Sequence, residues 1–243
     1  MCVLGQRLFV VAAHPDDDAI GCGGAISIVA RAGGAVCVSY LTDGSLSHPG
    51  SRSFTAEAVR DLREAEAIGA LAQLGVGTGP VFFRLPDSGL ATLSAEARLQ
   101  ARRRLAAMIE DFQPDLILAP WRRDPHSDHV AAGEIALDAA RDANYEGEFA
   151  GYQVWLPIRG TAADLPRAFE VRRIGFSIDA AAMAAKRRAI LAHRSQTTDL
   201  IDDPSGFRIG EDLLERWVTS IEPLLYEHRR RRPAGTQIGA VPV

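Results

Sequence analysis

Residues 8–44 read LFVVAAHPDDDAIGCGGAISIVARAGGAVCVSYLTDG and carry the clearest fold signal of the chain. The apolar run 8–13 predicts a buried strand, residues 19–32 predict a helix entered through a glycine-rich turn, and residues 35–41 predict a second strand. A continuous apolar run without alternation is typical of a strand that is covered on both faces of a parallel sheet. The stretch therefore predicts a first βαβ unit.

The same rhythm of strand and helix continues along the chain. Further helices are expected at 56–74, 94–111 and 128–143, and further strands at 81–85, 116–119 and 152–156. After these, the sequence predicts a strand within 169–178 and helices at 180–193 and 213–230. We therefore expect an α/β fold: a single-domain, Rossmann-like, doubly wound and mostly parallel sheet of order near 3-2-1-4-5, with helices on both faces and a C-terminal elaboration.

Composition and charge limit the domain organisation and the classes of partner. No linker, repeat or low-complexity block divides the 243 residues, so we expect one domain over 1–243, with a motif-bearing core at about 6–198 and a helical extension at about 199–243. A net charge of −4 argues against a nucleic-acid partner. The apolar runs are shorter than the roughly 18 to 20 residues of a membrane span, and a cytoplasmic location is expected. The sequence leaves a homo-oligomer open.

Polar side chains gather directly after the first and the fourth predicted strand. The first strand ends in AHPDDD at 13–18, and RDPHSDH at 123–129 follows the fourth. In a doubly wound sheet of this order these two strands are neighbours where the winding direction reverses, and loops there form the ligand-binding crevice. Two imidazoles and a carboxylate brought together in this way match the ligands of a catalytic zinc, with another divalent metal as the alternative.

Each residue of these stretches also has a purely structural interpretation. His14 could cap the following helix, and the carboxylates at 16–18 could be an acidic first turn that the helix dipole favours. Three consecutive carboxylates beside a histidine repel one another, however, and a bound dication removes that repulsion. The two clusters together favour a metal site.

AHPDDD and PHSDH resemble the motifs of the PIG-L/LmbE family of zinc-dependent de-N-acetylases. Three later stretches extend the resemblance over about residues 6–198: REAE at 63–66, LPDSG at 85–89, and the segment from Lys186 to HRSQ at 193–196. The family removes N-acetyl groups from amino sugars and their conjugates. The resemblance therefore implies a zinc-dependent amide hydrolase that acts on a small amino-sugar substrate by attack of activated water on the amide carbonyl.

The resemblance also implies a role for individual residues. It makes His14, Asp17 and His129 the zinc ligands. Asp16 becomes the general base that accepts a proton from the attacking water. His126, in its protonated form, would stabilise the oxyanion together with the metal.

The remaining site residues are expected around this centre. Asp128, between the two histidines, would fix the tautomer of a ring and support an imidazolium, or cap the helix that starts there. The resemblance also implies that Arg63 and Asp87 contact the substrate. Four residues stay without an assigned role: Asp18, Arg122, Arg123 and His193.

Two other functions compete with the hydrolase. A non-haem Fe(II) oxygenase also uses two histidines and one carboxylate, but its site usually lies in a jelly-roll and does not need Asp16. A non-catalytic Rossmann-like module could bind a ligand through the glycine run at 21–24. That run is not GxGxxG, and the acidic triplet before it would repel a pyrophosphate.

Overall fold

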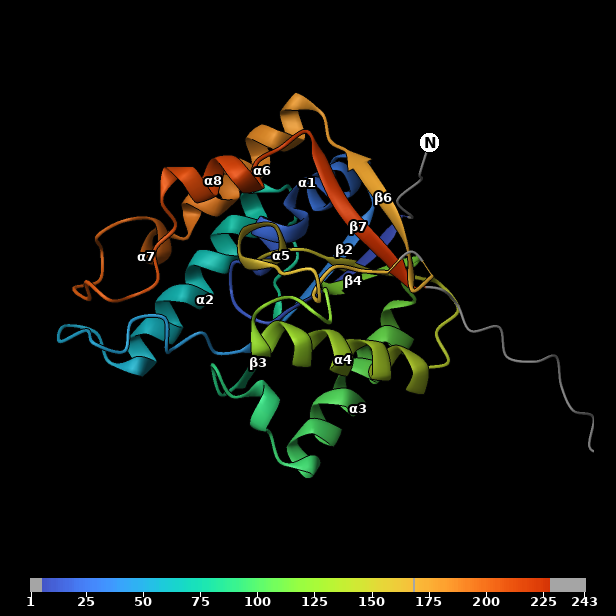
Figure 1. Cartoon of the computed structure of the whole chain (residues 1–243), viewed down its shortest axis with the longest axis horizontal. Coiled ribbons are helices and arrows are strands. Elements are labelled where there is room, and N and C mark those ends of the chain that lie inside the picture. Colours follow the sequence, from blue (N-terminus) through green and yellow to red (C-terminus); the bar gives the residue numbers. More distant parts are fainter. Residues whose placement is uncertain (1–5, 168, 228–243) are drawn as a thin grey trace, which may run out of the picture.

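A single seven-stranded sheet organises the protein (Figure 1). The computed structural model describes residues 6–167 and 169–227. The strands are β1 (Arg7–Ala12), β2 (Ala35–Thr42), β3 (Val81–Leu85), β4 (Leu116–Pro120), β5 (Glu148–Tyr152), β6 (Val171–Ser177) and β7 (Ile221–Glu227). Their order is β3-β2-β1-β4-β5-β7-β6; the first five are parallel, and β7 runs antiparallel to both β5 and β6. The predicted α/β class, Rossmann-like winding and central strand order are confirmed.

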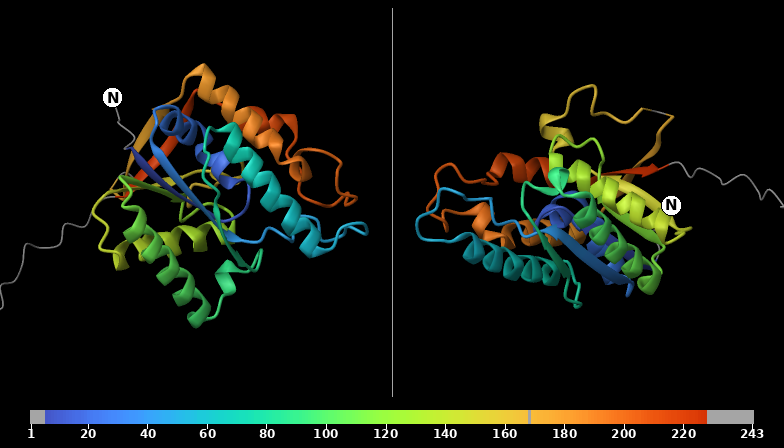
Figure 2. Two further views of the ribbon diagram at one scale, coloured as in Figure 1. Left: turned by 180° about the vertical axis from the view of Figure 1, so that it is seen from behind. Right: turned by 90° about the horizontal axis from the view of Figure 1, so that it is seen from below.

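Helices cover both faces of the sheet, as the two views of Figure 2 show. The long helices are α1 (Asp17–Arg31), α2 (Ala56–Gln73), α3 (Ala95–Phe112), α4 (Ser127–Asp142) and α6 (Ala180–Ala192). Shorter ones are the 3-10 turn Leu90–Thr92, α5 (Leu156–Arg159), α7 (Arg194–Thr197) and α8 (Glu211–Trp217). Side chains of Thr55, Ser94 and Asp179 accept backbone N–H groups in the first turns of α2, α3 and α6, which fixes where these helices begin.

Strand β1 shows why its sequence is apolar after Arg7, its exposed first residue. Leu8, Val10 and Ala12 belong to the core beneath α1, α2 and α6, whereas the intervening Phe9 and Val11 belong to the core beneath α3 and α4. Successive side chains of a strand point to opposite faces, so a strand at the centre of a covered sheet has no solvent-facing position.

The fifth strand lies earlier than the sequence predicts. The expected strand at 152–156 is wrong: β5 is Glu148–Tyr152, paired with β4, and residues 156–159 form α5. The N–H groups of Val154, Trp155 and Leu156 donate to the carboxylate of Asp124 instead of to a neighbouring strand. A five-residue stretch that starts with a glutamate and contains an alanine and a glycine (EFAGY) is a weak strand signal, and its pairing with β4 decides its conformation.

Of the helical extension expected for 199–243, the described residues 199–227 contain one short helix and a strand, and residues 228–243 lie outside the described part of the chain. The helix predicted at 213–230 ends with α8 at Trp217, and β7 follows at Ile221–Glu227; residues 228–230 lie outside the described part of the chain. In β7 the alternation of Glu222, Leu224 and Tyr226 places buried side chains on one face. Glu222 is buried because it accepts the N–H groups of Gly24 and Ala25 and pairs with Lys186 at 2.7 Å.

Candidate metal and catalytic site

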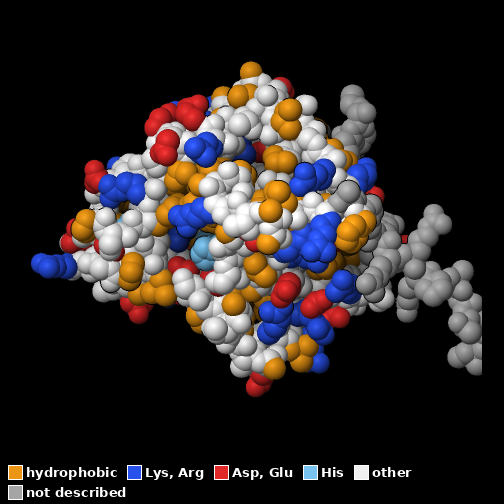
Figure 3. Space-filling model, in the orientation of Figure 1, with side chains coloured by type: hydrophobic (Ala, Val, Ile, Leu, Met, Phe, Trp, Pro, Cys, Tyr) orange, Lys and Arg blue, Asp and Glu red, His pale blue; other side chains and the backbone are white. Residues whose placement is uncertain are grey.

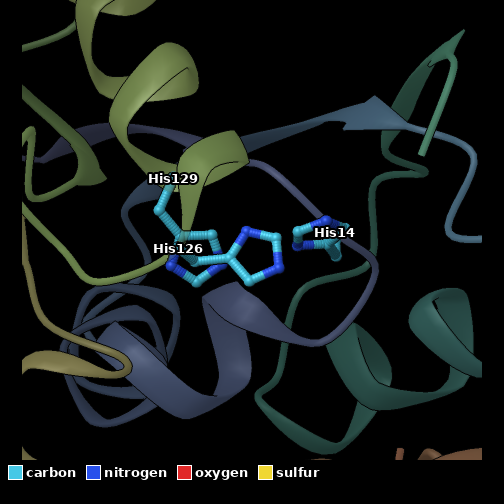
Figure 4. A group of neighbouring side chains, drawn as sticks. All are labelled: His14, His126 and His129. Atoms are coloured by element: carbon cyan, nitrogen blue, oxygen red, sulfur yellow. The ribbon is translucent and has the colours of Figure 1, made fainter. Parts of the chain in front are cut away.

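Strands β1 and β4 bring the two predicted polar stretches together. The strands pair in parallel over Leu8–Leu116, Phe9–Ile117 and Val10–Leu118, so their carboxyl ends lie side by side. His14 follows β1, whereas His126 and His129 lie at the start of α4, which follows β4 (Figure 4). The ring centroids of these three histidines are 4.8 to 5.4 Å apart.

Asp17 faces two of these imidazoles. Its Oδ1 lies 3.2 Å from His129 Nε2, and its Oδ2 lies 3.3 Å from His14 Nδ1. All three side chains are buried. Burial raises the pKa of Asp17, but His129 and His14 more than offset this and hold it well below its usual range.

The outer nitrogen of each imidazole also faces a carboxylate. His129 Nδ1 lies 3.0 Å from Asp124 Oδ1, and His14 Nε2 lies 3.2 Å from Asp128 Oδ2 and 3.3 Å from Asp87 Oδ1. Burial lowers the pKa of His129, but Asp17 and Asp124 bring it to about 9. Carboxylates behind the imidazoles are the usual surroundings of histidines that bind a metal.

These donors fit a divalent metal ion. Within the described residues, ligand atoms of His14, His126 and His129 lie within 4.8 Å of one another, and so do those of His14, Asp87 and Asp128. Imidazole nitrogens and carboxylate oxygens are the ligands of zinc and of other transition metals. The predicted ligands His14, Asp17 and His129 are not one of these two groups; they lie together through the contacts of Asp17 with both imidazoles, and its carboxylate supplies negative charge that a dication would neutralise.

Asp16 lies beside this group in an unusual backbone conformation. Its φ of 151° falls in a region that residues with a side chain rarely adopt, and such strain clusters at functional sites. Arg63 Nη2 donates to Asp16 Oδ2 at 3.0 Å and to the carbonyl of Pro15 at 2.9 Å, and Nη1 donates to the carbonyl of Gly44 at 2.8 Å. Burial raises the pKa of Asp16 to about 6, although Arg63 acts in the opposite direction.

His126 caps α4. Its Nδ1 accepts the backbone N–H of Asp128 at 3.2 Å, so this nitrogen carries no proton. Burial, together with the neighbouring His129 and His14, lowers the pKa of His126 to about 4. The expectation of a protonated His126 is therefore not what this arrangement favours. The alternative in which Asp128 caps the helix is wrong, because His126 occupies the cap position.

Asp128 and Asp87 converge on the same nitrogen of His14. Asp128 Oδ1 accepts the N–H of Leu90 at 3.0 Å, and Asp87 Oδ2 accepts the N–H of Leu46 at 2.8 Å. The carboxylate of Asp128 thus contacts the ring of His14 and not that of His126. Burial raises the pKa of Asp87, but the contact with His14 outweighs burial and brings the pKa down to about 2.

The residues without a predicted role fall into two groups. Arg122 Nε donates to Glu227 at 2.9 Å, and Arg123 makes a two-point ion pair with Glu170 at 2.9 and 2.7 Å. Asp18 and His193 are completely buried. Burial raises the pKa of Asp18 to about 7 and lowers that of His193 to about 3.

Asp124 is a residue of this site that the sequence did not reveal. The residue opens the DPHSDH stretch, five positions before His129, and this position was the only available signal. A spacing of five residues across a loop and a helix start does not predict contact. Only the folded loop brings its carboxylate against the imidazole.

The site can be reached from outside. Of the five described histidines, His126 is the one that is not buried. A histidine side chain reaches the surface near the middle of the face shown in Figure 3, next to basic side chains. Among the described residues, no helix combines the length and the hydropathy needed to cross a membrane.

Comparison with known proteins gives a family and a fold. The profile of the PIG-L family, described as GlcNAc-PI de-N-acetylase, matches residues 9–140. A 1D-myo-inositol 2-acetamido-2-deoxy-alpha-D-glucopyranoside deacetylase of Actinosynnema mirum is 30% identical over 242 residues, covering 82% of this chain and 84% of that protein. The same-named protein of Mycobacterium sp. (strain KMS) is 30% identical over 167 residues, covering 60% of this chain. The match spans about half of that relative, 54% of its length.

A solved structure shares the fold. The zinc-inhibited form of teicoplanin deacetylase Orf2 superposes with a TM-score of 0.71 and 19% sequence identity, covering 93% of this chain and 100% of that one.

Proposed function

Because this chain belongs to the PIG-L family of GlcNAc-PI de-N-acetylases, we propose that it is a metal-dependent hydrolase that removes an N-acetyl group from an amino-sugar conjugate. The observation that carries the proposal is the pair of imidazoles, His14 and His129, that face the single carboxylate of Asp17. Two imidazoles and a carboxylate form a ligand set that leaves a position for water. The substrate class is supported by the relatives, whose names describe deacetylases of an acetamido sugar linked to inositol.

We assign the metal to His14, Asp17 and His129 and propose zinc as its identity, with another divalent metal as the alternative. When bound, zinc lowers the pKa of a water molecule toward about 7 and polarises the amide carbonyl. Asp128 and Asp87 behind His14, and Asp124 behind His129, hold the two rings in place.

Asp16 accepts the proton of the attacking water in this proposal. Arg63 holds one carboxylate oxygen of Asp16, and the strained backbone turns the residue out of the first turn of α1. As the carbon–nitrogen bond breaks, the proton passes to the amine nitrogen, so acetate and a free amino sugar leave. A carboxylate next to a metal ligand is well placed for such general base catalysis.

His126 stabilises the oxyanion as a neutral imidazole. The N–H of Asp128 donates to Nδ1, so the single ring proton is on Nε2 and can be donated to the developing negative charge. Neutral donors serve in many oxyanion sites, because their fixed orientation costs no reorganisation during the reaction. An imidazolium is therefore not required.

Arg63 and Asp87 are predicted substrate contacts, but their described contacts lie within the protein. Arg63 is 3% exposed and its guanidinium binds Asp16 and two carbonyls, which favours a role in holding Asp16. Asp87 is 8% exposed and borders His14. A sugar hydroxyl at Asp87 stays a prediction, as do a single domain over 1–243, a cytoplasmic location and a homo-oligomer.

The competing functions find less support. The α/β sheet is not the jelly-roll in which iron oxygenases usually place two histidines and a carboxylate. A binding module has no use for a strained carboxylate that is held beside the metal-ligand group. Asp16 is therefore the residue that separates a hydrolase from both alternatives.

The test combines metal analysis with acetate release. Wild-type protein is expected to hold about one zinc per chain and to release acetate from N-acetylglucosaminyl inositol and simpler N-acetylglucosaminides. Asp16→Asn should keep the metal and lose most turnover. The control is Asp142→Asn: Asp142 is the last residue of α4 and pairs with Arg102 at the surface, so this variant should keep both metal content and turnover. Near wild-type turnover in Asp16→Asn would remove Asp16 as base. A protein that takes up no zinc and releases no acetate would overturn the whole function, and bound iron would favour the oxygenase.

A further inference from the structure

The carboxylate of Asp124 joins two elements that meet at the site. Its Oδ1 lies 3.0 Å from Nδ1 of His129 on α4. Its Oδ2 accepts three consecutive backbone N–H groups at the start of α5: Val154 at 3.3 Å, Trp155 at 2.8 Å and Leu156 at 3.0 Å. Asp124 is 3% exposed and His129 is 1% exposed, so both partners are held within the protein.

This arrangement determines which nitrogen of His129 faces the metal-ligand group. Both ring nitrogens face carboxylates, which only accept hydrogen bonds: Nδ1 faces Asp124 and Nε2 faces Asp17 at 3.2 Å. A metal ion at Nε2 would need the lone pair of that nitrogen, and the single ring proton would then be on Nδ1, where Asp124 accepts it. We propose that Asp124 is a positioning residue that presents Nε2 of His129 to a divalent metal and fixes it to the backbone of residues 154–156. The inference rests on the proposed metal-dependent function.

The three N–H groups make an aspartate specifically suitable here. They satisfy one carboxylate oxygen completely and so keep the other oxygen directed at His129. An asparagine has a single acceptor oxygen. If that oxygen faces the three N–H groups, its NH2 group opposes Nδ1–H of His129; if the amide is turned round, its NH2 group opposes the backbone donors. The first orientation leaves Nδ1–H of His129 without an acceptor, and the second supplies that acceptor only by leaving three backbone N–H groups opposite an NH2 group.

Other contacts of the same loop provide a matched control. Arg123 pairs with Glu170, and Trp121 Nε1 donates to the carbonyl of Asp164 at 3.0 Å. These bonds attach the loop after β4 to residues 164–170, but they do not touch His129. Glu170→Gln therefore loosens the loop without changing the partner of the imidazole.

The experiment compares zinc affinity in the full-length wild type, Asp124→Asn and Glu170→Gln, by competition with a chromogenic chelator. Asp124→Asn is expected to bind zinc about 10- to 100-fold more weakly, the usual effect of removing the hydrogen-bond partner of a metal-binding histidine. Glu170→Gln should bind within about threefold of the wild type. Thermal unfolding of each metal-free protein shows whether the variants are folded at the temperature of the titration.

Equal zinc affinity in wild type and Asp124→Asn would overturn the assignment of Asp124 while leaving the proposed hydrolase intact. An equal loss in Glu170→Gln would also overturn it, because anchoring of the loop would then explain both variants. If Asp124→Asn does not fold, Asp124→Ser takes its place, and failure of both to fold would assign Asp124 to fold stability alone. A wild type that binds no zinc would refute this inference and the proposed function together.

Discussion

The buried imidazole of His193 makes the stability of the fold depend on pH. His193 lies between α6 and α7 and is 0% exposed, and neither ring nitrogen has a hydrogen-bond partner among the described residues. Burial is the main cause that lowers its pKa from 6.5 to about 3; Arg63 acts in the same direction, and Asp17 opposes it. The folded protein therefore keeps His193 neutral where the unfolded chain protonates it.

The sign and size of the effect follow from this difference in proton binding. Because the unfolded state binds the extra proton, the contribution of His193 to stability is complete above pH 6.5 and falls as the pH drops from 6.5 toward 3. At pH 5, about 1.5 pH units below 6.5, the loss is about 2 kcal/mol at about 1.36 kcal/mol per unit. His193→Leu, which cannot bind a proton, should lack this loss.

The assay is denaturant unfolding of wild type and His193→Leu at pH 8 and at pH 5, with a chelator present so that metal binding does not enter. Groups near the site that also titrate are common to both proteins, so the difference between the two pH dependences isolates His193. The wild type should lose about 2 kcal/mol more than the variant between the two pH values. Parallel losses would refute the reasoning, because they would show that the folded protein accommodates the imidazolium of His193.

Three further predictions concern the sheet, the oxyanion and helix packing. Glu222→Gln should lower the free energy of unfolding by about 3 to 5 kcal/mol, because it leaves the ammonium of Lys186 buried without its counter-charge; a loss below about 1 kcal/mol in denaturant unfolding would contradict this. His126→Ala should keep its metal and lose about 10²- to 10³-fold in turnover, measured by acetate release, and an unchanged rate would reassign the oxyanion donor. Gly133→Ala should destabilise the protein by about 1 to 3 kcal/mol, since a Cβ there would lie 2.5 Å from the carbonyl oxygen of Pro120. Gly69→Ala in α2, where a Cβ meets nothing within 4 Å, should stabilise by about 0.5 to 1 kcal/mol, and equal effects at both glycines in thermal or denaturant unfolding would count against the packing argument.

Sequence alone determined the central architecture of this protein. The unbroken apolar run of β1 and the helix pattern after it required a strand covered on both faces, and the reversal of winding between β1 and β4 placed His14 near His129. The polar residues that gather at this edge were therefore predictable from local patterns combined with one topological rule. The chemistry of their side chains was sufficient to indicate a metal site.

The partner that each buried polar group meets depends on the folded arrangement of distant elements. Glu222 falls within the helix predicted at 213–230, whereas β7 places it against Lys186 and against the N–H groups of Gly24 and Ala25 in α1, which lie nearly 200 positions away in the chain. Asp124 likewise acquires its role only when residues 154–156 turn their N–H groups toward it. Local patterns report the preference of a segment for helix, strand or burial, whereas the hydrogen-bond partner of a buried charge depends on elements that are distant in sequence and become neighbours only in the folded sheet.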